Sequence, residues 1–237
     1  MTLMLQRHLS STLRAFAIAS SFALACVFCL PLPAQSGQAG SLDGLINRLL
    51  PDGAPPSDLQ VNPDQRERII TKLKAAQSRA HGLRAQQLAF ILATLNVGFG
   101  KNRDYLFHAL SGCNFPQIRY GCDEKTGEYL IYLYKHGHEE ILAPLLKTSI
   151  DGYNAAATEA LGADFSEMVE KSPGSFLQAV KTLPIPTQKR VCSFAGSGDG
   201  GGLGATGLAS ARRNLRKIGG EVALRCLAEI EGANKPD

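Results

Sequence analysis

The sequence of 237 residues contains no tryptophan, five histidines and an aromatic fraction of only 7%. The lack of tryptophan and the scarcity of histidine disfavour a carbohydrate cleft. The sequence also lacks the Gly-Lys-Ser/Thr triplet of a Walker motif, so it does not predict a P-loop for nucleotides. Negative charge is absent from the amino-terminal part of the chain, where the first acidic residue is Asp43. This absence is typical of an export signal.

A long apolar run follows the positively charged start of the chain. Arg7 and Arg14 precede residues 15–32, which are almost all apolar, and a short Leu-Pro-Ala segment ends at Ala34. A membrane-spanning helix would need about 20 apolar residues without such an exit, so we predict a signal peptide that is cleaved near Ala34. A lipid anchor at Cys26 is disfavoured, because the residues after that cysteine stay apolar. The mature protein is therefore expected to be secreted or periplasmic.

Removal of the signal peptide, residues 1–34, leaves 203 residues and lowers the formal net charge from +4 to +2, because it takes away two arginines and no acidic residue. A nearly neutral chain gives no strong signal for binding nucleic acid or an anionic membrane. A chain of about 200 residues can bury its core as one domain. We place a single α-helical domain at residues 62–237, after an amino-terminal segment and proline-rich linker at residues 35–61.

Four of the six cysteines remain after removal of the signal peptide. Disulfides form in the oxidising compartments that exported proteins reach, so we expect two of them. Four cysteines allow three pairings, and the pairing of nearest neighbours closes the shortest loops. Each bridge should stabilise the fold by about 2.5 to 4 kcal/mol. The predicted disulfides are Cys113–Cys122 and Cys192–Cys226.

Two segments have clear signals of α-helices. Asn62 and Pro63 are residue types preferred at an N-cap and at the first helical position, which predicts a helix from here to about Ala80. In the segment that begins at Ala85, residues 88–95 are apolar on nearly every side but too few to cross a bilayer, which predicts a central buried helix. We therefore expect an all-α fold.

The segment Tyr-Lys-His-Gly-His-Glu-Glu at residues 134–140 carries most of the chain's candidate chemistry. The preceding residues 129–134 read as a helix, with an N-cap candidate at Thr126, and Gly137 has the residue type that ends a helix. The two glutamates then fall in the first turn of a following helix, where negative charge is favourable. We interpret the segment as a turn between two helices.

A metal site is the alternative interpretation of this turn. On an unbroken helix His136 and His138 would point about 200° apart, so they do not match the four-residue spacing of helical zinc sites. A loop-borne site would gather His108, Cys113, Cys122 and one of these two histidines around zinc. Because oxidation competes for both thiols in an export compartment, we expect no cofactor.

Two segments about 34 residues apart have similar layouts. Residues 141–148, Ile-Leu-Ala-Pro-Leu-Leu-Lys-Thr, match residues 175–182, Ser-Phe-Leu-Gln-Ala-Val-Lys-Thr, and each follows a helix and a turn with Gly or Pro. The region from Lys125 to Arg190 therefore resembles HEAT-type α-hairpin repeats. The resemblance implies a short HEAT-like stack used for binding, without catalytic residues. An irregular helical bundle, stapled by the two disulfides, is the alternative, since only two units are found.

Two segments near the carboxyl end could contact anions. The glycine-rich residues 196–207 resemble a phosphate cradle, but the segment follows a helix and lacks the Walker lysine, so we interpret it as a connection. A cluster of basic side chains on a predicted helix could contact an anion or a partner, although a solvated face is the simpler interpretation. The cluster comprises Arg212, Arg213, Arg216 and Lys217.

The sequence as a whole predicts an exported helical protein that binds another protein in the periplasm or outside the cell. The glycine-rich segment contains a Gly-Ser-Gly triplet, but the strand-turn-helix setting of a serine nucleophile is not predicted there. The alternative is a small secreted hydrolase with its site at the turn of residues 134–140. Its candidate site residues are His136, His138, Glu139 and Glu140.

Overall fold

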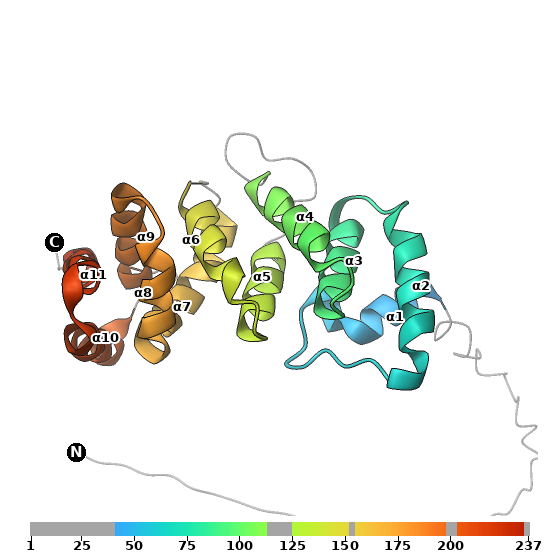
Figure 1. The fold of residues 1–237 in the computed structure, drawn as a ribbon, viewed down its shortest axis with the longest axis horizontal. Coiled ribbons are helices and arrows are strands. Elements are labelled where there is room, and N and C mark those ends of the chain that lie inside the picture. Colours follow the sequence, from blue (N-terminus) through green and yellow to red (C-terminus); the bar gives the residue numbers. More distant parts are fainter. Residues whose placement is uncertain (1–40, 113–124, 152–154, 198–202, 235–237) are drawn as a thin grey trace, which may run out of the picture. The chain divides into compact units, whose positions relative to one another are not determined.

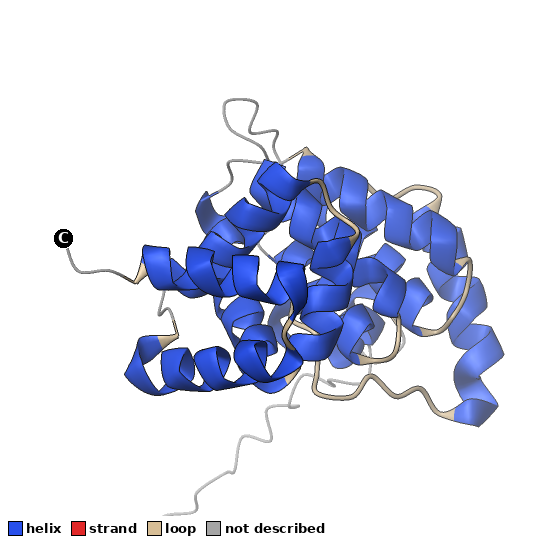
Figure 2. Cartoon of the chain, turned by 60° about the vertical axis from the view of Figure 1, so that its left-hand side comes forward, coloured by secondary structure: helices blue, strands red, loops and turns tan. Residues whose placement is uncertain are grey.

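The structure, a computed structural model, describes residues 41–112, 125–151, 155–197 and 203–234. In these ranges the regular secondary structure is helical throughout, as Figure 2 shows, with eleven α-helices, three short 3₁₀ segments and no strand. The predicted all-α fold is confirmed. All described residues belong to one compact unit, Ser36–Asp237. The predicted signal peptide and the predicted bridge between Cys113 and Cys122 lie outside the described residues.

The helices follow one another along the chain with short connections. The three 3₁₀ segments are η2 (Pro51–Gly53), η3 (Pro63–Gln65) and η4 (Glu139–Ile141). None of the helices in the described ranges combines the length and the apolarity that a bilayer crossing requires. The α-helices are α1 (Leu42–Leu49), α2 (Arg66–Gln77), α3 (Gly82–Thr94), α4 (Phe99–Ser111), α5 (Lys125–Lys135), α6 (Leu142–Asp151), α7 (Ala155–Lys171), α8 (Pro173–Lys181), α9 (Ile185–Ser197), α10 (Gly204–Ile218) and α11 (Gly220–Ala233).

Helices pack mainly against their close neighbours in the sequence. Helix α1 and every helix from α3 to α9 contact the helix two positions further along the chain. Figure 1 shows the same order in space, from α1 and α2 at one side to α10 and α11 at the other. This arrangement joins the apolar faces of successive helices into one continuous core. The HEAT-type resemblance stays a prediction.

Helix α3 is the central buried helix that its apolar run predicts. Its residues 85–93 are all buried, including two glutamines. The ring of Phe90 stacks on Tyr129 of α5 with centroids 4.5 Å apart, and it meets the edge of Tyr132 at 5.2 Å. Aromatic pairs in such geometries add to the free energy gained from burial. Helices α3 and α5 therefore form the aromatic part of the core.

Tyrosines of α5 hold the proline-rich stretch against the helical body. The hydroxyl of Tyr129 donates to the carbonyl oxygen of Gly53 at 2.6 Å, and the amide of Leu59 donates to the hydroxyl oxygen of Tyr132 at 2.7 Å. Leu59 itself is buried in the core. Prolines prevent regular backbone hydrogen bonds in this stretch, and the side chains of α5 fix it instead.

The N-cap predicted at Asn62 is confirmed, and two other predicted helix ends differ. The side chain of Asn62 accepts a hydrogen bond from the amide of Asp64 at 2.9 Å, as expected of an N-cap. Helix α2 ends at Gln77, three residues before Ala80, and continues as a turn. The N-cap predicted at Thr126 is wrong, because this residue lies inside α5 with its buried hydroxyl bonded to Gln86 at 2.8 Å.

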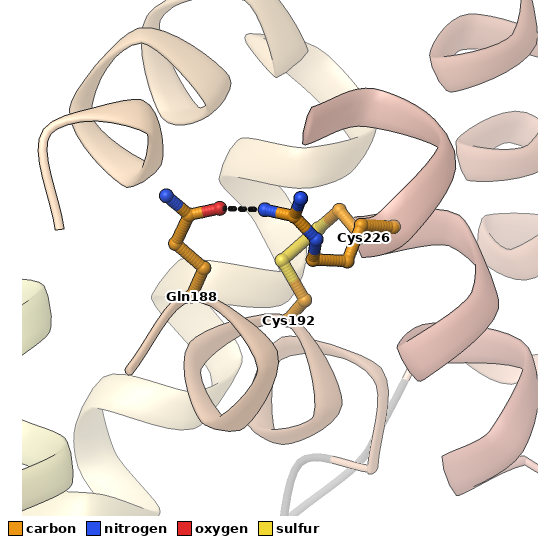
Figure 3. Close-up of a disulfide and its surroundings, with 4 residues drawn as sticks. Gln188, Cys192 and Cys226 are labelled. Atoms are coloured by element: carbon orange, nitrogen blue, oxygen red, sulfur yellow. Dashed lines mark hydrogen bonds between the residues drawn. A yellow bond between two sulfur atoms is a disulfide. The ribbon is translucent and has the colours of Figure 1, made fainter. Parts of the chain in front are cut away.

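Helices α9 and α11 run parallel and in close contact. Cys192 and Cys226 form the predicted disulfide between them. Beside it, Arg225 donates to the side-chain oxygen of Gln188 at 2.6 Å (Figure 3). The paired residue numbers increase together along both helices, so the helices point in the same direction. The bridge joins residues 34 positions apart and fixes the last helix to the body.

Candidate functional site

The turn between α5 and η4 has the geometry that its sequence predicts. Gly137 has a φ of 99°, a left-handed conformation that glycine adopts without strain. The amide of His138 donates to the carbonyl oxygen of Leu133 at 3.2 Å, and the amide of Gly137 donates to that of Tyr134 at 3.1 Å. These two bonds form a Schellman motif. The turn therefore satisfies the free carbonyl groups at the end of α5.

The two histidines of the turn are held apart by different aromatic partners. The ring of His136 stacks on Tyr132 with centroids 3.8 Å apart, and the ring of His138 stacks on Phe99 at 3.9 Å. Nδ1 of His136 lies 2.8 Å from the backbone oxygen of Tyr132, while Nδ1 of His138 lies 3.6 Å from a carboxylate oxygen of Glu140. The ring of His136 therefore packs on a side chain of the preceding helix α5, and the ring of His138 packs the turn against α4.

The metal site proposed as an alternative is not assembled by the described side chains. His108 lies exposed on α4, and Cys113 and Cys122 fall outside the described residues. Across the part of the chain that the structure describes, no group of three or more His, Cys, Asp or Glu side chains could hold a metal ion. A site that includes the two cysteines stays a prediction.

The glutamates of the turn line a groove between η4, α6 and α8. The groove has a volume of about 270 Å³ and opens to solvent. Residues 141–148 and 175–182, the two segments with similar sequence layouts, both contribute residues to its lining. The histidines do not line it. The lining residues are Tyr134, Glu139, Glu140, Leu142, Ala143, Ser175, Gln178, Ala179 and Thr182.

The chemistry of this groove suits recognition of a polypeptide. Ser175 and Gln178 of α8 and Thr182 at its C-cap are spaced three or four residues apart, so they lie along one side of the helix and present hydrogen-bonding groups. The hydroxyl of Thr182 donates to the carbonyl oxygen of Ala179 at 2.7 Å and is therefore left as an acceptor. Glu139 and Glu140 add two carboxylates to the lining, and none of the described residues that line the groove is a cation. Apolar side chains lie among the polar groups. The groove therefore offers apolar contact, hydrogen bonds and negative charge.

The basic cluster of α10 is partly neutralised by α11. All four basic side chains are exposed, as the interpretation of a solvated face requires. Nε of Arg212 lies 2.8 Å from a carboxylate oxygen of Glu231, and Arg216 approaches the same oxygen at 3.8 Å. Arg213 bonds to the Ser210 hydroxyl at 3.3 Å. One carboxylate shared by two arginines weakens the cluster as a site for a free anion.

The glycine-rich segment enters the helices at both of its ends, while residues 198–202 lie outside the described ranges. Gly196 belongs to α9, and a Cβ atom on it would lie 2.9 Å from Cα of Ile230 in α11. Gly207 belongs to α10, where a Cβ atom would meet the side chain of Leu203 at 3.3 Å. The glycine-rich sequence alone does not indicate that these glycines allow close packing, because the contact depends on residues elsewhere in the chain.

An ion-pair network that the sequence analysis missed joins α5 to α7. Lys135 donates to Asp164 at 2.8 Å and lies 3.5 Å from Glu167, which also accepts from Lys171 at 2.7 Å. The hydrogen bond from Lys171 lowers the pKa of Glu167, and attraction to Lys135 lowers it further. Burial lowers the pKa of Lys135, but the bonds and charges of its two carboxylate partners outweigh burial and raise it. The only sequence signal was the four-residue spacing of Glu167 and Lys171.

Comparison with known proteins gives no relative from which a function could be transferred: no protein-family model, no curated protein and no solved structure matches this chain.

Proposed function

We propose that this chain is an exported helical binding protein that docks a segment of a partner protein in the groove between η4, α6 and α8. The observation that carries the proposal is the composition of the groove, which is lined by two carboxylates, a row of hydrogen-bonding side chains and apolar residues. Polypeptide segments are commonly recognised through such a combination of apolar contact and fixed polar groups. The negative charge of the groove favours a segment that carries lysine or arginine beside apolar side chains.

Two further features support a binding role over hydrolysis. The helix-by-helix packing places the groove between the two segments whose similarity to HEAT-type repeats predicts a scaffold. A hydrolase would need His136 or His138 free to transfer protons at a bound substrate, whereas both rings lie flat against aromatic neighbours outside the groove.

The bridge between Cys192 and Cys226 is in keeping with export to an oxidising compartment.

Selection from a random peptide library displayed on phage tests the proposal. The bait is the mature chain, residues 35–237, and selected peptides are synthesised and measured by fluorescence anisotropy. We expect the enriched peptides to share lysine or arginine next to apolar residues. Neutralising both carboxylates in Glu139→Gln/Glu140→Gln should weaken their binding by about 5- to 30-fold, the range for two exposed ion pairs of up to about 1 kcal/mol each.

The matched control is Asp64→Asn/Glu67→Gln. Both pairs of acids occupy the first turn of a helix, so both double variants lose similar interactions with the helix dipole. Of the two pairs, Glu139 and Glu140 line the groove, whereas Asp64 and Glu67 do not. The proposal fails if no basic motif is enriched, or if the selected peptides bind the Glu139/Glu140 variant as tightly as they bind the wild-type chain.

A further inference from the structure

A second groove lies among the first three α-helices, away from the groove described above. Its volume is about 540 Å³, and like the first it opens to solvent. Residues of α1, of α2 with the turn that follows it, and of α3 form its walls. The lining residues are Leu42, Asp43, Lys72, Ala75, Ala76, Arg79, Ala80, Arg84 and Leu88.

The charge of this second groove is positive. Lys72, Arg79 and Arg84 line it, against the single carboxylate of Asp43. Nη2 of Arg84 bonds to Oδ1 of Asp43 at 2.6 Å, and Nη1 of the same guanidinium bonds to Gln87 at 3.2 Å. These bonds fix Arg84 at the edge of the groove. Among the described residues that line the groove, three cations stand against one carboxylate, and this composition favours an anionic partner over a cationic one.

The apolar part of this groove is shallow and built from small side chains. Ala75, Ala76 and Ala80 belong to one side of α2 and the turn after it, and Leu42 and Leu88 come from the neighbouring helices. The alanine side chains are short, so a partner can approach close to the α2 backbone. Cations beside a low apolar strip present the complement of a helix with apolar residues on one face and acidic residues at the borders.

We propose that this basic groove docks an acidic amphipathic helix of a partner protein. Helices bind apolar grooves through residues spaced three and four apart, and charges at the rim select the partner. A free fatty acid fits less well, because pockets for small ligands enclose most of the ligand surface, whereas this groove is open. With the acidic groove beside α8, the chain would present two docking surfaces of opposite charge.

Titration of the ¹⁵N-labelled mature chain with two synthetic peptides tests this second site. The probe is a capped peptide of glutamate, alanine and leucine, about 15 residues long so that its helix is not too short to form. The comparison peptide has lysine in place of every glutamate. We expect the acidic peptide to shift amide resonances of Ala75, Ala76 and Ala80, and the basic peptide to leave them unchanged. Binding should weaken as salt is added.

Charge reversal on α2 and in the turn after it separates a docking site from general attraction. Arg79→Glu removes a cation that lines the groove, while Arg68→Glu makes the same change at an exposed position of α2 outside it. We expect the first variant to weaken binding of the acidic peptide about tenfold or more, equivalent to about 1.4 kcal/mol, and the second to change it less than about twofold. Circular dichroism establishes that both variants are folded.

Three results would overturn the proposal. The first is the absence of resonance shifts in the three alanines at millimolar acidic peptide. The second is equal weakening by both charge reversals, which would show attraction to the whole helix surface. The third is a set of shifts at these alanines with oleate or with phosphatidylglycerol vesicles but not with the peptide, which would assign the groove to a lipid anion. The acidic groove beside α8 contributes to none of these readouts, so the two sites are tested separately.

Discussion

At Gly196 the absence of a side chain sets how closely α9 approaches α11. A Cβ atom there would lie 2.9 Å from Cα of Ile230 and 3.2 Å from its carbonyl oxygen, so the obstacle is backbone and cannot rotate away. Asn234 reinforces the contact, since its side chain donates to the carbonyl oxygens of Gly196 at 3.0 Å and Ile230 at 2.8 Å. The disulfide lies one helical turn earlier on each helix, so cross-link and close packing act on the same helix pair.

We predict that Gly196→Ala lowers the free energy of unfolding by about 1–3 kcal/mol, the usual cost of overpacking a close contact. The measurement is the midpoint of urea unfolding followed by circular dichroism. Gly232→Ala is the matched control, because this glycine also lies in a helix of the pair and a Cβ atom there would meet nothing within 4 Å. Alanine at the control position should stabilise the protein by up to about 1 kcal/mol. Equal midpoints for both variants would show that α9 and α11 do not need this approach.

At the scale of elements, α5 organises the amino-terminal half of the described chain. Its tyrosines contact Phe90 of α3, one by stacking and one edge-on, and bond to the proline-rich stretch, so one helix holds both a buried neighbour and an irregular segment. Burial raises the pKa of Tyr132, the hydrogen bond from the Leu59 amide opposes this rise, and the charge of Asp58 adds to it. The neutral phenol is therefore the form that the fold retains.

We predict that Tyr132→Phe lowers stability by about 1–2 kcal/mol, because the buried amide of Leu59 loses its acceptor while the ring packing is kept. Hydrogen exchange at the Leu59 amide should accelerate more than exchange in α9 and α11. Tyr105→Phe, at a position 39% exposed, removes a hydroxyl near solvent and should change stability by less than about 0.5 kcal/mol. Unchanged exchange at Leu59 in the first variant would contradict the role given to this hydrogen bond.

The raised pKa of Tyr132 also gives the expected dependence of stability on pH. Its pKa is higher in the folded state than the ordinary value of 10.0, so its contribution is fully present below that pH and is lost as the pH rises through the folded pKa. The wild-type protein should therefore lose stability more steeply above about pH 10 than Tyr132→Phe does. Urea unfolding at neutral and alkaline pH measures this difference.

The elements that could be predicted from sequence are those specified by local patterns. The apolar run of α3, the cap at Asn62 and the glycine that ends α5 each need only a few consecutive residues, and the structure confirms all three. The grooves could not be predicted in this way. Glu139 and Ser175 line one groove because α6 packs beside α8, and the sequence of neither segment states which side chains the other brings to that groove.

Helix packing also explains why some basic residues line a groove and others pair with a carboxylate. Of the basic residues Arg68, Lys72 and Arg79 in α2 and the turn after it, Lys72 and Arg79 line the second groove, where Arg84 of α3 joins them. The cluster on α10 was more conspicuous in the sequence, yet two of its arginines share the carboxylate of Glu231 from α11. A neighbouring helix can add cations to a basic cluster or neutralise it with a carboxylate. The sequence pattern of a single helix does not contain this information.

At the scale of the whole molecule, the proposed role requires the chain to leave the cytoplasm and to oxidise its cysteines. The disulfide between Cys192 and Cys226 lies in the body of the fold, where both cysteines are about 1% exposed. It is therefore shielded from exchange with thiols in solution. The sequence predicts a second bridge between Cys113 and Cys122, and cleavage near Ala34 removes the remaining cysteines. An exported chain should therefore contain no free thiol.

We predict that the exported protein has a denatured mass matching a chain that starts at Gln35, lower by four hydrogens than the mass after reduction, because two disulfides account for its four cysteines. Peptide mapping without reduction should recover Cys113 with Cys122 and Cys192 with Cys226. The double variant Cys113→Ser/Cys122→Ser provides the control, since it should differ from its reduced form by two hydrogens only. A chain that retains Met1 would contradict export by cleavage. Free thiols together with bound zinc in the native mass spectrum would instead favour the metal site that gathers His108 with the cysteines, and would direct the first functional assay to hydrolysis.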